Sequence, residues 1–389
     1  MIPYGRQDIT QADLDAVRDV LTSDFLTQGP RVPEFEASVA AVAGAAHGVA
    51  ANSATSALHA ACMALDLGPD DWLWTVPNTF VASANVGVYC GAQVDFVDID
   101  PVTYNMCPKA LAAKLDDARA KGRLPKVLIP VHMTGQSADM EAIGALARAH
   151  GIKVVEDASH AIGATFADQP VGACTHSDIT VFSFHPVKIV TTAEGGVAVT
   201  QDADLAARMR RAVSHGITRD PDQMTHASDG PWYYQQIELG YNYRMTELQA
   251  ALGLSQMTRL HDYVGARTAK AQVYDQAFAD LPLDTPWQDP RSASSWHLYV
   301  IQLRLDELAW THRRVFEELR ARGLGVNLHY IPVHTQPFYR ARGFTDGDFP
   351  NAEGYYARAI SIPLFATMTT HQQMTVIDTV HEVLKQAAP

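Results

Sequence analysis

Short apolar runs alternate with longer amphipathic segments over the first half of the chain. The apolar runs predict buried strands at residues 48–51, 73–76, 93–97, 127–131, 154–156, 179–184 and 197–200, and the last two runs are rich in β-branched residues. The segments between and before them predict helices at residues 8–22, 34–42, 52–67, 111–120, 140–150 and 202–214, and another helix beginning near residue 79. This alternation predicts an α/β fold in which helices cover a mostly parallel, doubly wound sheet.

The last third of the chain has a different pattern. After an irregular polar stretch at residues 217–236, Thr246-x-x-Gln249 resembles a capping pattern and opens a helix. A long helix to about residue 279 and a Pro-rich stretch then lead to predicted strands at 296–303 and 326–331, an extended piece at 361–364, and helices at 313–322 and at the chain end. We therefore expect a large domain over residues 1–257 and a smaller α+β domain over residues 258–389.

One lysine, Lys188, lies in the polar loop between the predicted core strands 179–184 and 197–200. A lysine so close to the interior is partly desolvated, which lowers its pKa and leaves a nucleophilic amine suited to a Schiff base. A lone loop lysine more often extends to solvent, so its neighbours decide between the two interpretations.

The neighbours of Lys188 favour a catalytic lysine. Asp157 ends the apolar run 154–156, at the carboxyl end of a predicted parallel strand, where open α/β sheets bind ligands. Pyridoxal 5′-phosphate (PLP) needs a lysine to attach it and a carboxylate to keep its pyridinium nitrogen protonated. Ser183 lies five residues before Lys188 and can reach the cofactor phosphate.

Small residues, several with hydroxyl groups, open the helix that follows the first predicted strand of the sheet. Residues 52–58 read Asn-Ser-Ala-Thr-Ser-Ala-Leu, and a helix N-terminus of this kind can bind a phosphate through its free amides. The commoner use of such residues is an ordinary N-cap. Together with Asp157, Ser183 and Lys188, the segment is predicted to hold the cofactor phosphate.

These motifs resemble those of the DegT/StrS family of nucleotide-sugar aminotransferases. The resemblance extends over nearly the whole chain and rests on Asp157-Ala158-Ser159-His160, Ser183 to Lys188, Thr192-Ala193-Glu194-Gly195-Gly196, and Gly240 to Ala251. It implies fold type I of the PLP-dependent enzymes, an aspartate aminotransferase-like fold, with PLP as cofactor and a homodimer that shares its active sites.

The resemblance also implies roles for individual residues. Lys188 and Asp157 are the expected catalytic residues. The expected cofactor-binding residues are Ala54, Thr55, Phe80, Asp157, His160, Ser183, Lys188 and, from the other subunit, Asn242. The expected substrate-binding residues are Tyr4, Asp24, Phe25, Leu26, Thr27, His329 and Tyr330. For Phe80, His160, His329 and Tyr330, plain structural packing is the alternative interpretation.

The implied reaction transfers an amino group from L-glutamate to C4 of a UDP-4-keto-6-deoxy-N-acetylhexosamine. The product would be UDP-4-amino-4,6-dideoxy-N-acetyl-β-L-altrosamine, on the route to pseudaminic acid. Alternatives within the family are aminotransferases that make perosamine, 4-amino-arabinose or a 3-amino sugar. A PLP-dependent sugar 3-dehydratase is disfavoured because relatives with that activity carry histidine in place of this lysine.

Composition and motif content argue against several other classes of protein. A net charge of −13 and the lack of a basic block argue against nucleic-acid binding and against a DNA-binding regulator built on this fold. The four cysteines and 16 histidines show no metal-binding spacing, and reduced thiols with no signal peptide or membrane span predict a cytoplasmic protein without a metal. A Rossmann dehydrogenase is excluded because no G-x-G-x-x-G follows a first strand.

Overall fold

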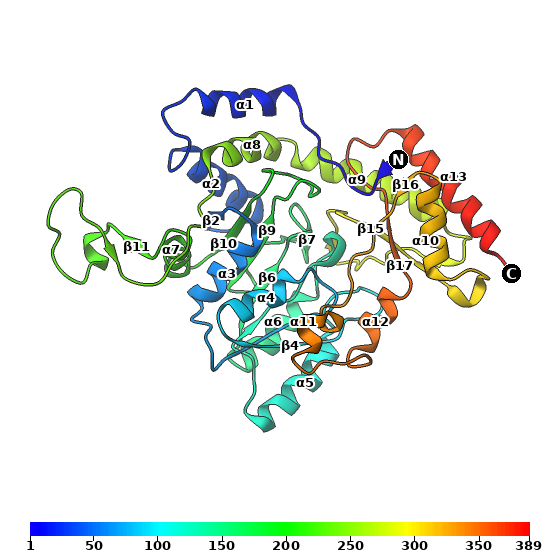
Figure 1. The fold of residues 1–389 in the computed structure, drawn as a ribbon, viewed down its shortest axis with the longest axis horizontal. Coiled ribbons are helices and arrows are strands. Elements are labelled where there is room, and N and C mark those ends of the chain that lie inside the picture. Colours follow the sequence, from blue (N-terminus) through cyan, green and yellow to red (C-terminus); the bar gives the residue numbers. More distant parts are fainter.

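A seven-stranded sheet lies at the centre of the computed structural model, which describes residues 1–389 (Figure 1). Along the sheet the strands are β2 (His47–Ala51), β10 (Gly196–Thr200), β9 (Ile179–Ser183), β6 (Lys153–Asp157), β5 (Val127–Leu128), β3 (Trp72–Thr75) and β4 (Gln93–Phe96). Only β10 is reversed: it pairs antiparallel with β2 and β9, whereas every other pair is parallel. The predicted mostly parallel sheet is confirmed.

Helices cover both faces of this sheet, as the alternating pattern predicted. One face packs against α3 (Ala54–Ala64), α4 (Ala82–Tyr89) and α7 (Ala203–Ala212). The other face packs against α2 (Arg31–Ala43), α5 (Pro108–Lys121), α6 (Met140–Ala149) and α8 (Glu247–Met257). Because successive strand residues point to opposite faces, Val154 of β6 packs on the α6 side and Val155 on the α3 side.

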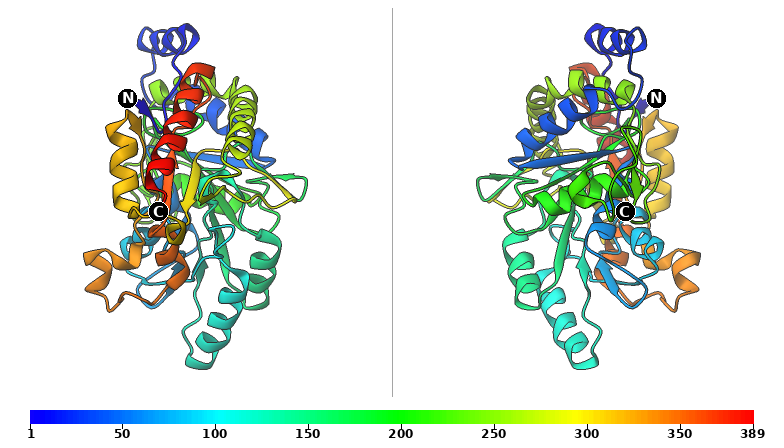
Figure 2. Two further views of the ribbon diagram at one scale, coloured as in Figure 1. Left: turned by 90° about the vertical axis from the view of Figure 1, so that its right-hand side faces the viewer. Right: turned by 90° about the vertical axis from the view of Figure 1, so that its left-hand side faces the viewer.

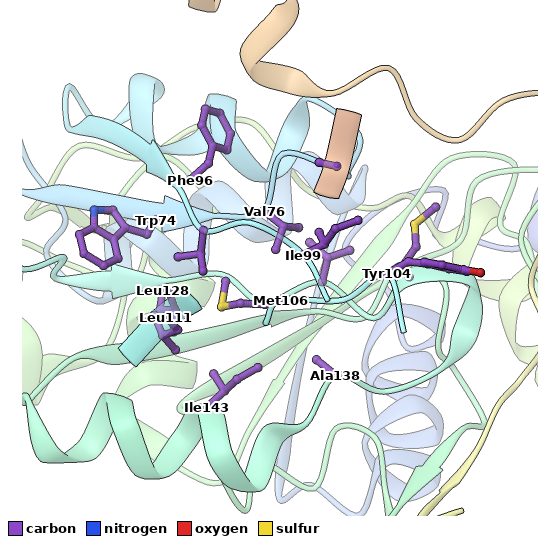
Figure 3. Packing of buried hydrophobic residues seen from close by; sticks show 14 of the residues in the cluster. Trp74, Val76, Phe96, Ile99, Tyr104, Met106, Leu111, Leu128, Ala138 and Ile143 are labelled. Carbon is purple, nitrogen blue, oxygen red and sulfur yellow. The ribbon is translucent and has the colours of Figure 1, made fainter. Parts of the chain in front are cut away.

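Large apolar side chains fill the layer between the sheet and α5 and α6. Figure 3 shows Trp74, Phe96 and Leu128 from the strands together with Leu111 and Ile143 from these two helices. All five side chains are buried. Deleting an aromatic side chain from such a layer typically costs about 3–5 kcal/mol of stability, so this layer contributes strongly to the stability of the sheet.

The C-terminal part of the chain forms its own antiparallel sheet. Its strands are β13 (Leu283–Asp284), β15 (Tyr299–Leu303) and β17 (Ala359–Ile362), and the helices around it are α9 (Leu260–Ala277), α10 (His312–Ala321) and α13 (Thr370–Ala387). In Figure 2, α10 and α13 lie together on the side that carries both chain termini. The N-terminal strand β1 (Ile2–Pro3) joins this part of the molecule by pairing in parallel with β16 (Leu324–Gly325).

Helix α9 runs between the two parts of the chain. Leu260 and Tyr263 at its start belong to the core under the large sheet, whereas Ala271 and Tyr274 further along belong to the core of the C-terminal part. The division between residues 257 and 258 stays a prediction, and α9 would be the element that connects the two domains.

The remaining elements lie at the periphery. Helix α1 (Gln11–Leu21) packs along α8 (Figure 1), and β11 (Ile217–Thr218) pairs with β12 (Gln235–Gln236) at the base of an arm that projects from the sheet near α7. The short helices α11 (Pro337–Arg340) and α12 (Pro350–Tyr356) pack beside β4, and β7 (Thr165–Phe166), β8 (Gln169–Pro170) and β14 (Ser292–Ala293) form a small sheet. No helix has the length and apolar character needed to cross a membrane.

Two sequence predictions have clear outcomes here. The predicted capping box is confirmed: Thr246 Oγ1 accepts from the backbone N–H of Gln249, and Gln249 Oε1 accepts from that of Thr246. The strand predicted at 326–331 is wrong. Only Asn327 makes a bridge, to Ser361, and the following residues leave the sheet to line a cavity.

Candidate active site

A cavity of about 860 Å³ opens at the carboxyl ends of β6 and β9, on the side of the sheet covered by α3 and α4. This is the edge at which open α/β sheets bind their ligands. Ten of the residues predicted from the sequence line it: Tyr4, Ala54, Thr55, Phe80, Asp157, His160, Ser183, Lys188, His329 and Tyr330.

Lys188 reaches the cavity from the loop between β9 and β10. The loop is closed at its base, where Phe184 accepts a hydrogen bond from the Thr192 amide at 2.9 Å, and Lys188 N–H donates to the His185 carbonyl at 2.9 Å. Burial lowers the pKa of Lys188 from 10.5 to about 8, against the opposing effect of the nearby Asp157 carboxylate. Lys188 therefore has the position and acidity expected of a nucleophilic amine.

Asp157 ends β6 with its carboxylate on the same side of the sheet. Its Oδ2 accepts from Ser83 Oγ at 2.7 Å, and its Oδ1 accepts from the Ser159 amide at 3.1 Å. These two bonds fix the direction of the carboxylate. Ser83 belongs to α4 and was not predicted from the sequence, because it lies 74 positions before Asp157 and only the fold brings them together.

The N-terminus of α3 closes another part of the cavity. Ser53 acts as the N-cap and accepts from the Ser56 amide at 3.1 Å, which leaves the first helical amides, those of Ala54 and Thr55, without an intrahelical acceptor. The backbone at Gly196 approaches so closely that a Cβ there would lie 2.5 Å from Ala54 Cα. The glycine thus lets β10 pack directly under this helix end.

Four aromatic and imidazole side chains surround Lys188. His160 Nε2 lies 3.1 Å from the Tyr330 hydroxyl, and the His160 ring centroid lies 4.4 Å from that of His297. Burial and the Lys188 charge lower the pKa of His329 to about 3, and they lower those of His160 and His297 as well. Burial raises the pKa of Tyr330. All four side chains are therefore uncharged at neutral pH.

Phe80 and Tyr4 lie against two of these rings, those of Tyr330 and His329. The Phe80 ring is 58% exposed and lies 6.2 Å, between centroids, from that of Tyr330. The Tyr4 ring lies 5.1 Å from that of His329, and burial raises the pKa of Tyr4. Because an aromatic ring packed into the core would be buried, the exposure of Phe80 argues against plain core packing there.

Five predicted residues do not line the cavity of their own chain. Asp24, Phe25, Leu26 and Thr27 are exposed, and the Leu26 carbonyl accepts from the Glu247 amide at the start of α8. Asn242 is also exposed, in the segment that pairs with Ser214. Residues 24–27 therefore do not line the cavity of their own chain and bond instead to the start of α8, and their contact with a substrate stays a prediction.

Several cavity residues were not predicted. His185 and Glu194 flank the Lys188 loop, with 3.9 Å between His185 Nε2 and Glu194 Oε1, and His297 and Asn327 come from the C-terminal part of the chain. The first two lie inside the motifs already quoted, so their positions beside Lys188 gave a usable signal. Nothing in the sequence around His297 or Asn327 distinguishes them from structural residues.

The cavity has the features that PLP requires. Lys188 can attach the aldehyde, Asp157 can face a ring nitrogen, and the free amides at the start of α3 can bind a phosphate with Ser183 nearby. The Nδ1 atom of His160 is buried without a partner, as expected of a group that completes its hydrogen bonding with a ligand. No three His, Cys, Asp or Glu side chains gather closely enough to hold a metal ion.

Comparisons with known proteins agree with this geometry. The sequence pattern of the DegT/DnrJ/EryC1/StrS aminotransferase family matches residues 7–381. The chain is 38% identical over 389 residues to the spore coat polysaccharide biosynthesis protein SpsC of Bacillus subtilis, covering 99% of this chain and 98% of SpsC.

Two solved structures illustrate the likeness in three dimensions. Helicobacter pylori PseC, an aminotransferase involved in the biosynthesis of pseudaminic acid, superposes with a TM-score of 0.89 at 29% identity and 99% coverage of both chains. The putative sugar aminotransferase Spr1654 of Streptococcus pneumoniae, in its pyridoxamine phosphate (PMP) form, gives a TM-score of 0.90 at 28% identity and full coverage of both. The chain therefore belongs to the DegT/DnrJ/EryC1/StrS family and is a PLP-dependent sugar aminotransferase of fold type I.

Proposed function

We propose that this enzyme transfers the amino group of L-glutamate to C4 of a UDP-4-keto-6-deoxy-N-acetylhexosamine. The product would be UDP-4-amino-4,6-dideoxy-N-acetyl-β-L-altrosamine, an intermediate of pseudaminic acid synthesis. The observation that carries the amino transfer is that Lys188 and Asp157 line one cavity together with the open N-terminus of α3. The likeness to PseC supports the choice of sugar.

Each residue has a distinct task in this proposal. When bound, PLP supplies an electron sink that stabilises negative charge at the α-carbon of the donor. Lys188 Nζ would hold the cofactor aldehyde. As a free amine, Lys188 would take the proton from the donor α-carbon and deliver it to C4′ of the cofactor, as general base and then general acid. Asp157 would accept the pyridinium N–H and so keep that nitrogen protonated.

The second half-reaction would use the same groups in the opposite order. There Lys188 would carry the proton from C4′ of the cofactor to C4 of the sugar. Neutral imidazoles suit this site, since His160 and His329 add no positive charge that would compete with the ring nitrogen for Asp157. We place His160 beside the ring hydroxyl of the cofactor, and Tyr4, His329 and Tyr330 beside the sugar.

We further propose that two copies of the chain share their active sites. Among the residues that line the cavity, Lys188 is the only lysine and there is no arginine, although the substrate carries a diphosphate. Residues 24–27 and Asn242 are exposed and lie outside their own cavity, so they are free to complete the site of a second copy. In this dimer Asn242 would contact the cofactor phosphate of the partner subunit.

Four free cysteines support a cytoplasmic location.

Mixing two inactive variants tests the shared site. Lys188→Ala and Asn242→Ala are unfolded, mixed in equal amounts and refolded, so that hybrid dimers form. If Asn242 acts across the dimer, each hybrid has one intact site, and activity returns to about a quarter of the wild-type value. If Asn242 acts within its own chain, the hybrids have no intact site and activity stays at the level of the separate variants.

Spectroscopy with defined sugars tests the substrate. The holoenzyme is converted to its aminated form with glutamate, the donor is removed, and candidate UDP-4-keto sugars are added. Return of the yellow lysine-bound cofactor with the 6-deoxy-β-L-arabino-hexosamine substrate, but not with the D-xylo isomer, would support the proposal. Return only with the D-xylo isomer or a GDP-linked sugar would assign another product, such as perosamine. Failure of glutamate to bleach the colour would exclude it as donor.

A further inference from the structure

A second buried carboxylate lies immediately behind Asp157. Because neighbouring strand residues face opposite ways, Glu156 points away from the cavity and toward the side of the sheet covered by α6. Glu156 is buried and does not line the cavity. A buried carboxylate is costly unless it is paired, so its partners should be informative.

Three side chains donate hydrogen bonds to the Glu156 carboxylate, and together they engage both of its oxygens. His132 Nε2 donates to Oε2 at 2.6 Å, Thr180 Oγ1 donates to Oε1 at 3.1 Å, and the Ser177 hydroxyl also donates to Oε1. The His132 side chain has no exposed surface. These hydrogen bonds, with that of His132 first among them, outweigh burial and lower the pKa of Glu156.

A backbone hydrogen bond fixes the tautomer of His132. The Ala138 amide donates to His132 Nδ1 at 3.0 Å, so Nδ1 is an acceptor and carries no hydrogen. The proton of the neutral ring is then on Nε2, where it faces Glu156. The pair therefore consists of a neutral imidazole that donates to an ionised carboxylate.

The same short segment also holds the backbone of Asp157. The His132 amide donates to the Asp157 carbonyl at 3.0 Å, and the Asp157 amide donates to the Pro130 carbonyl at 2.9 Å. Val131, between these two residues, makes the bridge to Asp157 and lines the cavity. The His132 side chain thus ties this segment to Glu156 while its backbone ties it to Asp157.

We propose that His132 and Glu156 form a positioning pair that fixes the Asp157 carboxylate against the ring nitrogen of the cofactor. This inference rests on the proposed role of Asp157. Neither residue of the pair touches the cofactor; they act by holding the end of β6 and the segment 130–132 in one register. The charge of Glu156 behind Asp157 also favours protonation of the group that Asp157 faces.

The test compares His132→Ala with a matched control elsewhere in the chain. His334 is an equally buried histidine whose Nε2 lies 2.9 Å from Glu353 Oε1, and neither residue lines the cavity. His132→Gln keeps a side-chain donor near the position of Nε2 and serves as the conservative variant. For each protein, the dissociation constant for PLP, the pH titration of the lysine-bound cofactor absorbance and the thermal midpoint are measured.

We expect His132→Ala to weaken PLP binding roughly tenfold, since it leaves a buried carboxylate short of a charged hydrogen bond. The titration midpoint of the lysine-bound nitrogen should move upward. Without the pair, the ring nitrogen of the cofactor is protonated less of the time, so its positive charge repels the proton on the lysine-bound nitrogen less. His132→Gln should restore most of both values. His334→Ala should lower the thermal midpoint without changing either cofactor property.

Equal behaviour of the two alanine variants would overturn the proposal and leave His132 a structural residue. So would a lower thermal midpoint of His132→Ala with unchanged binding and titration. Asp157→Asn separates this failure from a failure of the proposed function. If Asp157→Asn leaves the cofactor spectrum unchanged, Asp157 does not face the ring; if it changes the spectrum while His132→Ala does not, only the positioning pair is refuted.

Discussion

The acidity of Lys188 governs how quickly the apoenzyme can attach its cofactor. Only the neutral amine is nucleophilic, so the attachment rate follows the fraction of Lys188 that has lost its proton. Burial lowers the pKa of this amine from 10.5 to about 8. The pH of the reaction is therefore the perturbation that reports on the environment of the site.

The expected effect is large near neutral pH. A lysine of ordinary acidity is roughly 0.03% neutral at pH 7, whereas one with a pKa near 8 is roughly 10% neutral, a ratio of about 300. Going from pH 6 to pH 8, the rate of attachment should rise by roughly 50-fold, and above pH 9 it should change little.

The assay is stopped-flow absorbance of apoenzyme mixed with excess PLP between pH 6 and pH 11. We expect a single rise with its midpoint near pH 8 for Lys188. Nα-acetyl-lysine under the same conditions supplies the profile of an unperturbed amine, and Lys188→Ala should show no attachment. A midpoint close to that of the free amine would refute the claim that burial activates Lys188.

Stability of the apoenzyme gives an independent measure of the same shift. Between about pH 8 and pH 10.5, the unfolded chain holds the Lys188 proton more often than the folded chain does. The free energy of unfolding therefore increases with pH in this window. Below the window both states carry the charge, and burial penalises the folded state. Lys188→Met should remove this gain, which is read as the difference between the two proteins in urea unfolding. Parallel curves for the two proteins would contradict the shift.

Three further changes have defined outcomes. Ser83→Ala removes the 2.7 Å bond to Asp157 and should lower kcat/KM roughly tenfold, the usual effect of losing a hydrogen bond to a charged group; unchanged kinetics would show that Asp157 is oriented without it. Gly196→Ala places a Cβ 2.5 Å from Ala54 Cα, at the start of α3. The variant should bind PLP more weakly and lose about 1–3 kcal/mol of unfolding free energy in denaturant. Wild-type affinity for PLP would mean that this helix end is not the phosphate site. Thr246→Ala breaks the capping box of α8 and should cost about 1 kcal/mol of unfolding free energy, and no loss would show that packing alone holds this helix start.

Much of the large sheet could be predicted from the sequence because its strands are buried on both faces. Every residue of β9 and β10 is buried, so apolar content and length were enough to locate these two strands. A different pattern led to the wrong strand prediction at residues 326–331. Their alternation of apolar and polar side chains looks like that of a strand, but it serves to place His329 and Tyr330 in a cavity.

The candidate site could be predicted where one segment supplies both the residue and its setting. Lys188 lies in a loop between core strands and Asp157 at a strand end, and both settings are visible locally. Ser83 and His297 contribute through contacts that cross the fold, so no local pattern reveals them. Residues 24–27 could not be placed either, because their contact with α8 is equally remote in sequence.

The pairing of β1 with β16 has a practical consequence for making this protein. The second and third residues are part of a sheet, and Tyr4, the next residue, lines the cavity. A purification tag fused ahead of Met1 would begin next to the active site, only a few residues before Tyr4. There it could block substrate entry or displace Tyr4. The last residues, after α13, are exposed and belong neither to the cavity lining nor to a strand. A tag belongs at that end of the chain, and an inactive preparation tagged at the other end should be remade before any catalytic residue is questioned.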